Sequence, residues 1–207
     1  MREHKETGWR GSADLWLDAA YEALLSGGVA AVKIMPLATR LGLSRTSFYW
    51  HFTDREALLA ALIARWRDRN TANLIARTTA PAATITQAVL NLFDCWITPD
   101  LFDARLEFAI RNWAQTAPDL AQTLGAEDAT RLDALRAMFL RHGYAPDQAD
   151  IRARTIYLTQ IGYIALRTDE DTALRVARMP TYVETFTGMP PTDAEVRAFA
   201  ARHTDKL

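Results

Sequence analysis

Residues 33–55 read KIMPLATRLGLSRTSFYWHFTDR, and their pattern predicts two short helices joined by a tight turn. We expect the first helix to cover 36–41, because proline is tolerated in a first helical turn. Gly42 is suited to end that helix, since glycine reaches positive φ at little cost. Ser44 is a favoured N-cap residue for a second helix over 45–50. The pattern is typical of a helix-turn-helix, whose second helix can enter a DNA major groove.

The predicted second helix has an apolar side and a polar side. If Phe48 points inward, a rotation of about 100° per residue places Thr46 and Trp50 outward. Its flanks carry Arg45, Ser47 and Tyr49. These side chains offer donors for phosphates and base edges, and a methyl group that can touch thymine. The alternative is a surface helix whose two aromatic residues pack under a neighbour.

Several short motifs surround this stretch: Ala19-Ala20, Leu37-Ala38, Gly42-Leu43-Ser44, Phe48-Tyr49-Trp50-His51-Phe52 and Asp54-Arg55-Glu56-Ala57-Leu58-Leu59. With them, residues 9–67 resemble the N-terminal domain of the TetR family of bacterial transcriptional regulators. The resemblance implies an all-α fold in two domains. Residues 1–70 would form a three-helix DNA-binding head, with the helix-turn-helix at about 33–52. Residues 71–207 would form a helical-bundle body that binds an effector and dimerises.

Within the expected DNA-binding surface, residues have different roles. We expect base contacts from Arg45 and Thr46. Contacts to phosphate or sugar are expected from Lys33, Ser44, Ser47, Tyr49, Trp50, His51 and Arg55. The basic residues Arg2, Lys5 and Arg10 could also reach DNA, as N-terminal arms do, or remain solvated.

The composition agrees with a helical protein that has a local DNA-binding surface. Hydrophobic residues make up 49% of the 207 residues, charged residues 24%, and the net charge is −1. Residues 1–70 hold 10 Lys/Arg and 8 Asp/Glu, and residues 33–55 hold four and one. Cys95 is the single cysteine, so no disulfide can form within the chain. With neither a membrane span nor a signal-peptide pattern, we expect a cytoplasmic protein.

Helix signals continue beyond the motif. Thr53-Asp54-Arg55-Glu56 predicts a capping box in which Thr53 caps the next helix. A second box is predicted at Thr192 and Glu195. A helix over 119–142 is expected to be interrupted near Gly125, and one over 172–188 to be broken at Met179-Pro180.

A helix over 147–167 carries apolar residues on more than one side, which predicts burial on two sides. We expect it to pack on its own body and against a second subunit through Leu158, Gly162 and Leu166. Either 172–188 or the last helix would complete a four-helix interface, as is common in the family. The alternative is a central core helix of a monomer.

The body is rich in aromatic residues, and the family resemblance implies an effector cavity among its helices. The expected lining residues are Phe93, Trp96, Phe108, Arg111, Trp113, Phe139 and Tyr157. Such a pocket suits a small, largely apolar ligand. Arg111 either forms a local ion pair or meets a ligand carboxylate.

No motif for nucleotide binding, nucleophilic catalysis or metal ligation is found, so we expect no enzyme activity, cofactor or metal. The sequence therefore predicts a homodimeric, ligand-responsive repressor that binds a palindromic operator and is released by a small-molecule effector. Two alternatives stay open: a related activator, and a helical ligand-binding protein without specific DNA binding.

Overall fold

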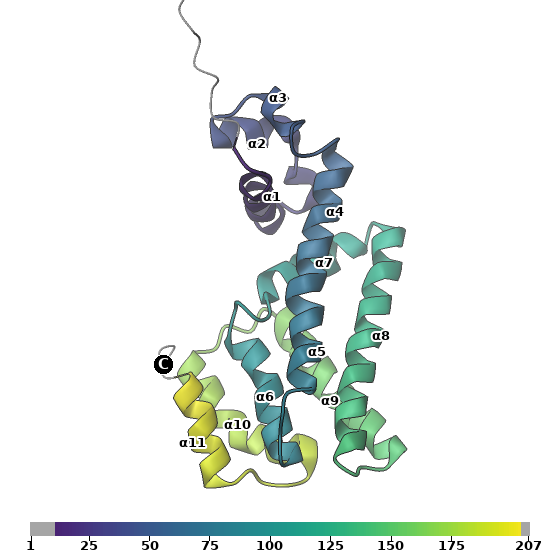
Figure 1. Cartoon of the computed structure of the whole chain (residues 1–207), viewed down its shortest axis with the longest axis vertical. Helices are drawn as coiled ribbons and strands as arrows, with labels where there is room; N and C mark the ends of the chain where they lie inside the picture. Colours follow the sequence, from purple (N-terminus) through teal and green to yellow (C-terminus); the bar gives the residue numbers. More distant parts are fainter. Residues whose placement is uncertain (1–10, 204–207) are drawn as a thin grey trace, which may run out of the picture. The chain divides into compact units, whose positions relative to one another are not determined.

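The computed structural model describes residues 11–203, which form helices and no strand (Figure 1). The chain divides into two compact units, the first ending at Arg65 and the second beginning at Trp66. The first unit contains α1 (Ala13–Gly27), the 3-10 helix η1 (Val29–Ala31), α2 (Ile34–Leu41), α3 (Arg45–Phe48) and nearly all of α4 (Arg55–Trp66). The second contains the π-helical segment η2 (Arg67–Thr71), α5 (Ala72–Thr78), α6 (Ile85–Ile97), α7 (Ala104–Ala114), α8 (Pro118–Arg141), α9 (Pro146–Ala165), α10 (Thr172–Thr187) and α11 (Asp193–Arg202). The predicted all-α fold is confirmed.

The two helices of the predicted helix-turn-helix differ slightly from expectation. α2 begins at Ile34, so Pro36 is its third residue and still lies in the first turn, where a backbone N–H would have no intrahelical acceptor and the proline costs no hydrogen bond. α3 ends at Phe48 rather than at Trp50. The chain continues as turns, in which the Phe52 amide donates to the Phe48 carbonyl at 3.0 Å.

The start of α4 corrects the predicted capping box. The Asp54 carboxylate, and not the Thr53 hydroxyl, accepts the Ala57 amide at 2.8 Å. Glu56 pairs with Arg55 at 3.0 Å instead of reaching back to the cap. Thr53 and Asp54 are both good cap residues, and the negative charge of Asp54 is favoured at a helix N-terminus.

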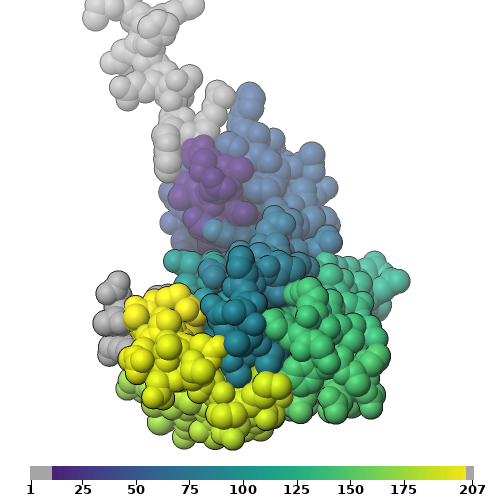
Figure 2. Space-filling view, turned by 60° about the horizontal axis from the view of Figure 1, so that its bottom comes forward, coloured from purple at the N-terminus to yellow at the C-terminus, as the bar shows by residue number. Residues whose placement is uncertain are grey.

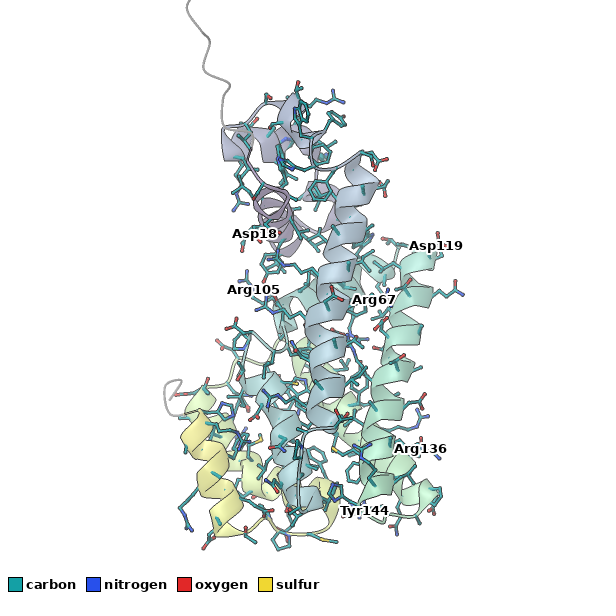
Figure 3. The ribbon with its side chains drawn as sticks, viewed as in Figure 1. Asp18, Arg67, Arg105, Asp119, Arg136 and Tyr144 are labelled. Atoms are coloured by element: carbon teal, nitrogen blue, oxygen red, sulfur yellow. The ribbon has the colours of Figure 1, made fainter. Side chains whose placement is uncertain are left out.

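The helical run that starts at Arg55 continues to Thr78, but its hydrogen bonding widens to a π-helical turn at η2. Asn70 lies within this turn and is fully buried. Its side-chain amide donates to the Asp103 carbonyl at 3.2 Å and accepts from the Asp103 backbone amide at 2.8 Å. Arg67 extends toward α8 and pairs with Glu127 at 2.7 Å (Figure 3). The wide turn is therefore held by side-chain contacts within the second unit.

In the second unit, α6 is buried along nearly its whole length and packs against α5, α8, α10 and α11. Figure 2 shows α11, in yellow, beside the teal α6. α8 and α9 pack along each other as a helical hairpin, and Tyr144 between them donates to the Thr187 carbonyl at 2.6 Å. Apolar residues of all these helices meet in one core.

Two predicted helix breaks are wrong, and one predicted cap is confirmed. α8 passes Gly125 without interruption, and α10 continues through Pro180. In α10, Met179 and Val183 lie on one buried face, so packing into the core sustains the helix across the proline. The capping box at Thr192 is present as predicted. Within the described residues, no helix is long and apolar enough to cross a membrane.

Candidate nucleic-acid interface

The turn between α2 and α3 is fixed by backbone geometry. Gly42 has φ of 65°, and its amide donates to the Thr39 carbonyl at 3.2 Å. The next amide, of Leu43, donates to the Ala38 carbonyl at 3.0 Å. These two bonds form a Schellman motif, which ends α2 and requires a residue that tolerates positive φ.

The two serines of the motif stabilise α3. The Ser44 hydroxyl accepts the Ser47 amide at 3.2 Å, as expected for an N-cap. The Ser47 hydroxyl donates to the Ser44 carbonyl at 2.8 Å, and the Ser47 side chain is buried. The structure thus places Ser47 under the helix, where it shapes the turn, while Ser44 stays exposed at its start.

An apolar centre holds α3 from below. Phe48 is fully buried and meets Trp16 of α1 edge-to-face, with ring centroids 5.2 Å apart. It also stacks on Phe52 at 5.6 Å. Burial of Trp16 was not predicted from the sequence. The available signal was the size of its indole, since large aromatic side chains contribute much of the buried area of a small core.

The side of the motif away from this centre carries four of the predicted residues, two in α3 and two in the turn that follows it. Arg45, Thr46, Tyr49 and Trp50 are all exposed, Trp50 to 63% of its surface. A tryptophan so exposed on a small folded unit is unusual, and it marks a surface suited to a partner. Lys33, immediately before α2, is exposed as well.

His51 and Arg55 are less accessible. His51 is half-buried, and its Nε2 atom has no hydrogen-bond partner among residues 11–203. Arg55 donates from Nε to the Val32 carbonyl at 2.7 Å and from Nη2 to the Val29 carbonyl at 2.8 Å. The Arg55 guanidinium thereby ties the start of α4 to the segment just before Lys33. Arg2, Lys5 and Arg10 lie outside the described residues.

The predicted pocket residues fall within the second unit. Phe93, Trp96, Phe139 and Tyr157 are buried, and Phe108, Arg111 and Trp113 are half-buried. Phe93 and Trp96 meet edge-to-face at 5.2 Å. Arg111 forms the local ion pairs that the sequence left open, to Asp128 at 2.6 Å and to Glu107 at 2.8 Å.

Arg111 belongs to a buried polar network centred on Glu107 and Arg131, both 0% exposed. Arg131 donates to Glu107 at 2.9 Å and to the Tyr157 hydroxyl at 3.1 Å. The other Glu107 oxygen accepts from the Trp66 indole at 2.6 Å. The buried network consists of the residues that these hydrogen bonds connect: Trp66, Asn70, Thr71, Glu107, Arg111, Asp128, Arg131 and Tyr157.

The network changes the acidity of its members. Burial alone would raise the pKa of the Glu107 carboxyl, but the positive charges of Arg131 and Arg111 outweigh it, and the pKa lies below its usual value. Burial raises the pKa of the Tyr157 hydroxyl, so Tyr157 stays neutral. Neither Glu107 nor Arg131 was predicted from the sequence as a site residue. The one available signal was the i, i+4 spacing of Glu107 and Arg111.

The predicted dimer residues lie along one stripe of α9 that continues to Leu166, the residue that caps its C-terminus. Leu158 and Leu166 are 59% and 80% exposed, and Ile151 on the same stripe is 62% exposed. A Cβ atom added at Gly162 would meet no other atom within 4 Å. The helix thus packs on its own body with one side and leaves a second apolar side uncovered.

Residues 17–62 match the family model for bacterial regulatory proteins of the tetR family. No curated protein sequence matches the chain significantly.

Solved structures share the fold along nearly the whole chain. AmtR from Mycobacterium smegmatis superposes with a TM-score of 0.61 at 17% identity, covering 98% of both chains. A transcriptional regulator from Rhodococcus sp. Rha1 gives 0.57 at 18% identity, covering 93% of this chain and 97% of that one. A Mesorhizobium loti protein described as a TetR-family transcriptional regulator gives 0.54 at 19% identity, covering 92% and 95%. Residues 17–62 thus match the N-terminal domain of the tetR family of bacterial regulatory proteins, and the fold of the whole chain is similar to that of solved transcriptional regulators.

Proposed function

We propose that this regulator is a repressor that binds a palindromic operator as a homodimer and leaves it when a small-molecule effector binds. The observation that carries the DNA-binding part is the exposed group formed by Arg45 and Thr46 of α3 and by Tyr49 and Trp50 of the turn that follows it. Buried Phe48 and the Ser44 cap support that group from within its own unit. Arg45 and Thr46 would contact base edges, since they lie in the first turn of the helix.

The phosphate contacts are proposed for exposed and half-buried residues in and around this group. Lys33, Ser44, Trp50 and His51 would bind phosphate or sugar, which fixes register without reading sequence. Ser47 and Arg55, whose polar groups bond to nearby carbonyls, would act by holding the turn and the start of α4. Any contact they make to DNA would be secondary to these bonds.

The proposed dimer uses the uncovered stripe of α9. Burying apolar surface contributes about 25 cal/mol per Å², and an exposed stripe of Ile151, Leu158 and Leu166 gains most from a matching apolar face. A second copy offers such a face in an isologous interface, as most homodimers do. Gly162, with open space beside it, would allow two helices to approach closely. Two α3 helices would then read half-sites separated by about one helical turn of DNA.

The proposed effector site lies in the second unit, among the buried and half-buried aromatic residues of the predicted pocket. A ligand there can weaken DNA binding only through a difference in its affinity for the DNA-bound and free conformations. Thermal-shift screening of small apolar compounds would find ligands. Each ligand should then reduce operator affinity, and a ligand that stabilises the protein yet leaves that affinity unchanged argues against the coupling.

Selection of preferred sequences from a randomised duplex library tests DNA binding directly. We expect palindromic sites from the wild type. Arg45→Ala should lose roughly 1–3 kcal/mol of specific affinity and relax the preference at the contacted position. Arg105→Ala removes an exposed arginine of the second unit and should change neither (Figure 3). Selection of no sequence by the wild type would refute the proposal. In vitro transcription from a promoter carrying the selected site then separates repression, which we expect, from activation.

Light scattering tests the dimer. We expect the wild type to be dimeric at micromolar concentration and Leu158→Glu to be monomeric, because a charge cannot be buried unpaired in an apolar interface. Leu140→Glu places the same charge at an exposed leucine of α8 and should stay dimeric. A monomeric wild type, or a dimeric Leu158→Glu protein, would contradict the interface on α9.

A further inference from the structure

We propose that Tyr49 is a positioning residue that aims the Arg45 guanidinium at a guanine, so that Tyr49 contributes to sequence specificity and not to general phosphate affinity. This inference rests on the proposed DNA-binding function. The Arg45 Nη2 atom donates to the Tyr49 hydroxyl at 2.9 Å, and Nε donates to the same oxygen at 3.3 Å. The guanidinium carbon lies 5.6 Å from the Tyr49 ring centroid. One phenol therefore holds one edge of the guanidinium.

The Tyr49 ring is itself held by the core of the first unit. It meets Phe48 edge-to-face, with centroids 5.3 Å apart and an interplanar angle of 83°. Phe48 is fully buried against Trp16. Successive aromatic contacts thus connect the core to the exposed hydroxyl. A phenol has only two side-chain torsions, so this one contact fixes its oxygen with little remaining freedom.

The edge of Arg45 that faces Tyr49 decides which edge remains for DNA. The hydroxyl takes Nε and one N–H of Nη2, and Nη1 donates to no residue within 11–203. At the far end of the guanidinium, Nη1 and the second N–H of Nη2 remain as two parallel donors. Guanine presents two adjacent acceptors, N7 and O6, in the major groove, whereas adenine presents an acceptor beside a donor. The two free N–H donors of Arg45 therefore match the two acceptors of guanine, and they do not match the acceptor and donor of adenine.

A held arginine also loses less on binding. A free arginine side chain carries large rotamer freedom, which a base contact must remove. Because Tyr49 restricts that freedom before DNA arrives, removing the hydroxyl oxygen should weaken the guanine contact although the arginine remains. A tyrosine that only gripped phosphate would behave differently, since phosphate contacts carry no sequence information.

The experiment compares Tyr49→Phe, Arg45→Ala and the control Tyr21→Phe with the wild type by selection from a randomised duplex library. In the wild type we expect a guanine in each half-site whose enrichment falls about tenfold in Arg45→Ala. Tyr49→Phe should lower the enrichment of that same guanine about threefold, and leave the affinity for unrelated duplex and its salt dependence unchanged. Tyr21→Phe, which removes a phenol oxygen from α1, should leave the preferred sequence intact. Unchanged thermal unfolding of Tyr49→Phe checks that its fold is intact.

Three results would overturn the inference while leaving the proposed DNA binding in place. In the first, Tyr49→Phe keeps the guanine preference but binds all duplexes more weakly, with a salt slope smaller by about one, as for a lost phosphate contact. In the second, Tyr49→Phe equals the wild type in both measurements. In the third, the position that depends on Arg45 is not a guanine. A wild type that selects no sequence would instead refute the proposed function, and with it this role of Tyr49.

Discussion

The two units of the chain have opposite interiors. Among the described residues of the first unit, Ser47 is the one buried polar side chain, and large apolar residues such as Trp16, Phe48 and Leu62 fill the centre. The second unit buries Glu107 and Arg131 completely inside its own apolar core. One unit keeps its charges at the surface, and the other places some of them at its centre.

This difference indicates what each interior does. An apolar centre needs no directional bonds, so the first unit can leave its arginines outside for a partner such as DNA. Burying an ion pair costs several kcal/mol of desolvation, which good geometry only roughly offsets. The buried network is therefore not a large source of stability. It does specify an arrangement, because Glu107 and Arg131 connect the helices α4, α7, α8 and α9 with η2 through directional bonds.

The largest expected effect comes from removing one member of that network. Arg131→Met should lower the free energy of unfolding by about 3–5 kcal/mol, because Glu107 would stay buried with half of its positive partners lost. The double variant Arg131→Met, Glu107→Leu should recover much of this loss, since no charge is then stranded. Urea unfolding measures the free energy of unfolding of both variants. If Arg131→Met were as stable as the double variant, the buried charge of Glu107 would not be the cause of the loss.

Acid should affect the second unit through Glu107. Its pKa in the folded protein lies below the usual 4.5, so its stabilising effect is complete above that value and is lost as the pH falls through the folded pKa. Glu107→Gln should therefore make the urea midpoint less dependent on pH below about 4.5. Glu56→Gln, an exposed site of the first unit, should leave that dependence as in the wild type. Equal acid dependence of Glu107→Gln and wild type would exclude this role.

A smaller effect is expected at the start of α4 in the first unit. Asp54→Ala should cost about 1 kcal/mol, because the Ala57 amide loses its acceptor. Thr53→Ala should cost about a tenth of that or nothing, since Thr53 is exposed and its hydroxyl does not cap the helix. Thermal unfolding measures the stability of the two variants. A larger loss in Thr53→Ala than in Asp54→Ala would show that Thr53 is the cap.

The smallest effect is expected at Cys95. Burial raises the pKa of its thiol to about 12, so almost no thiolate forms at neutral pH. A disulfide reagent should therefore modify the native protein very slowly and the urea-unfolded protein at once. Rapid modification of the native protein would show that the core of the second unit opens easily.

The helix-turn-helix could be predicted because its signals are local. Gly42, Ser44 and Phe48 each act within a few residues of their own position, so spacing alone fixed the turn. Where two suitable cap residues stood side by side, at Thr53 and Asp54, spacing could not choose between them.

The interior of the second unit could not be predicted in the same way. Glu107 meets Arg131 across 24 positions and Trp66 across 41, and nothing local marks such pairs. Breaks expected at Gly125 and Pro180 did not occur, since packing of long helices outweighs the unfavourable propensity of one residue. The exposed stripe of α9, by contrast, follows directly from an apolar pattern too broad for one buried face.

The π-helical turn at η2 also has a consequence for how this chain can evolve. Removing one residue from a regular helix rotates everything after it by about 100°, which displaces every buried side chain beyond that point. A π turn contains one residue more than the α turn it replaces. Deletion of the exposed Asp68 should convert η2 to α-helix and leave Trp66 and Asn70 on their buried faces. The longest helical run of the first 80 residues thus contains a site where its length can change by one residue without loss of register.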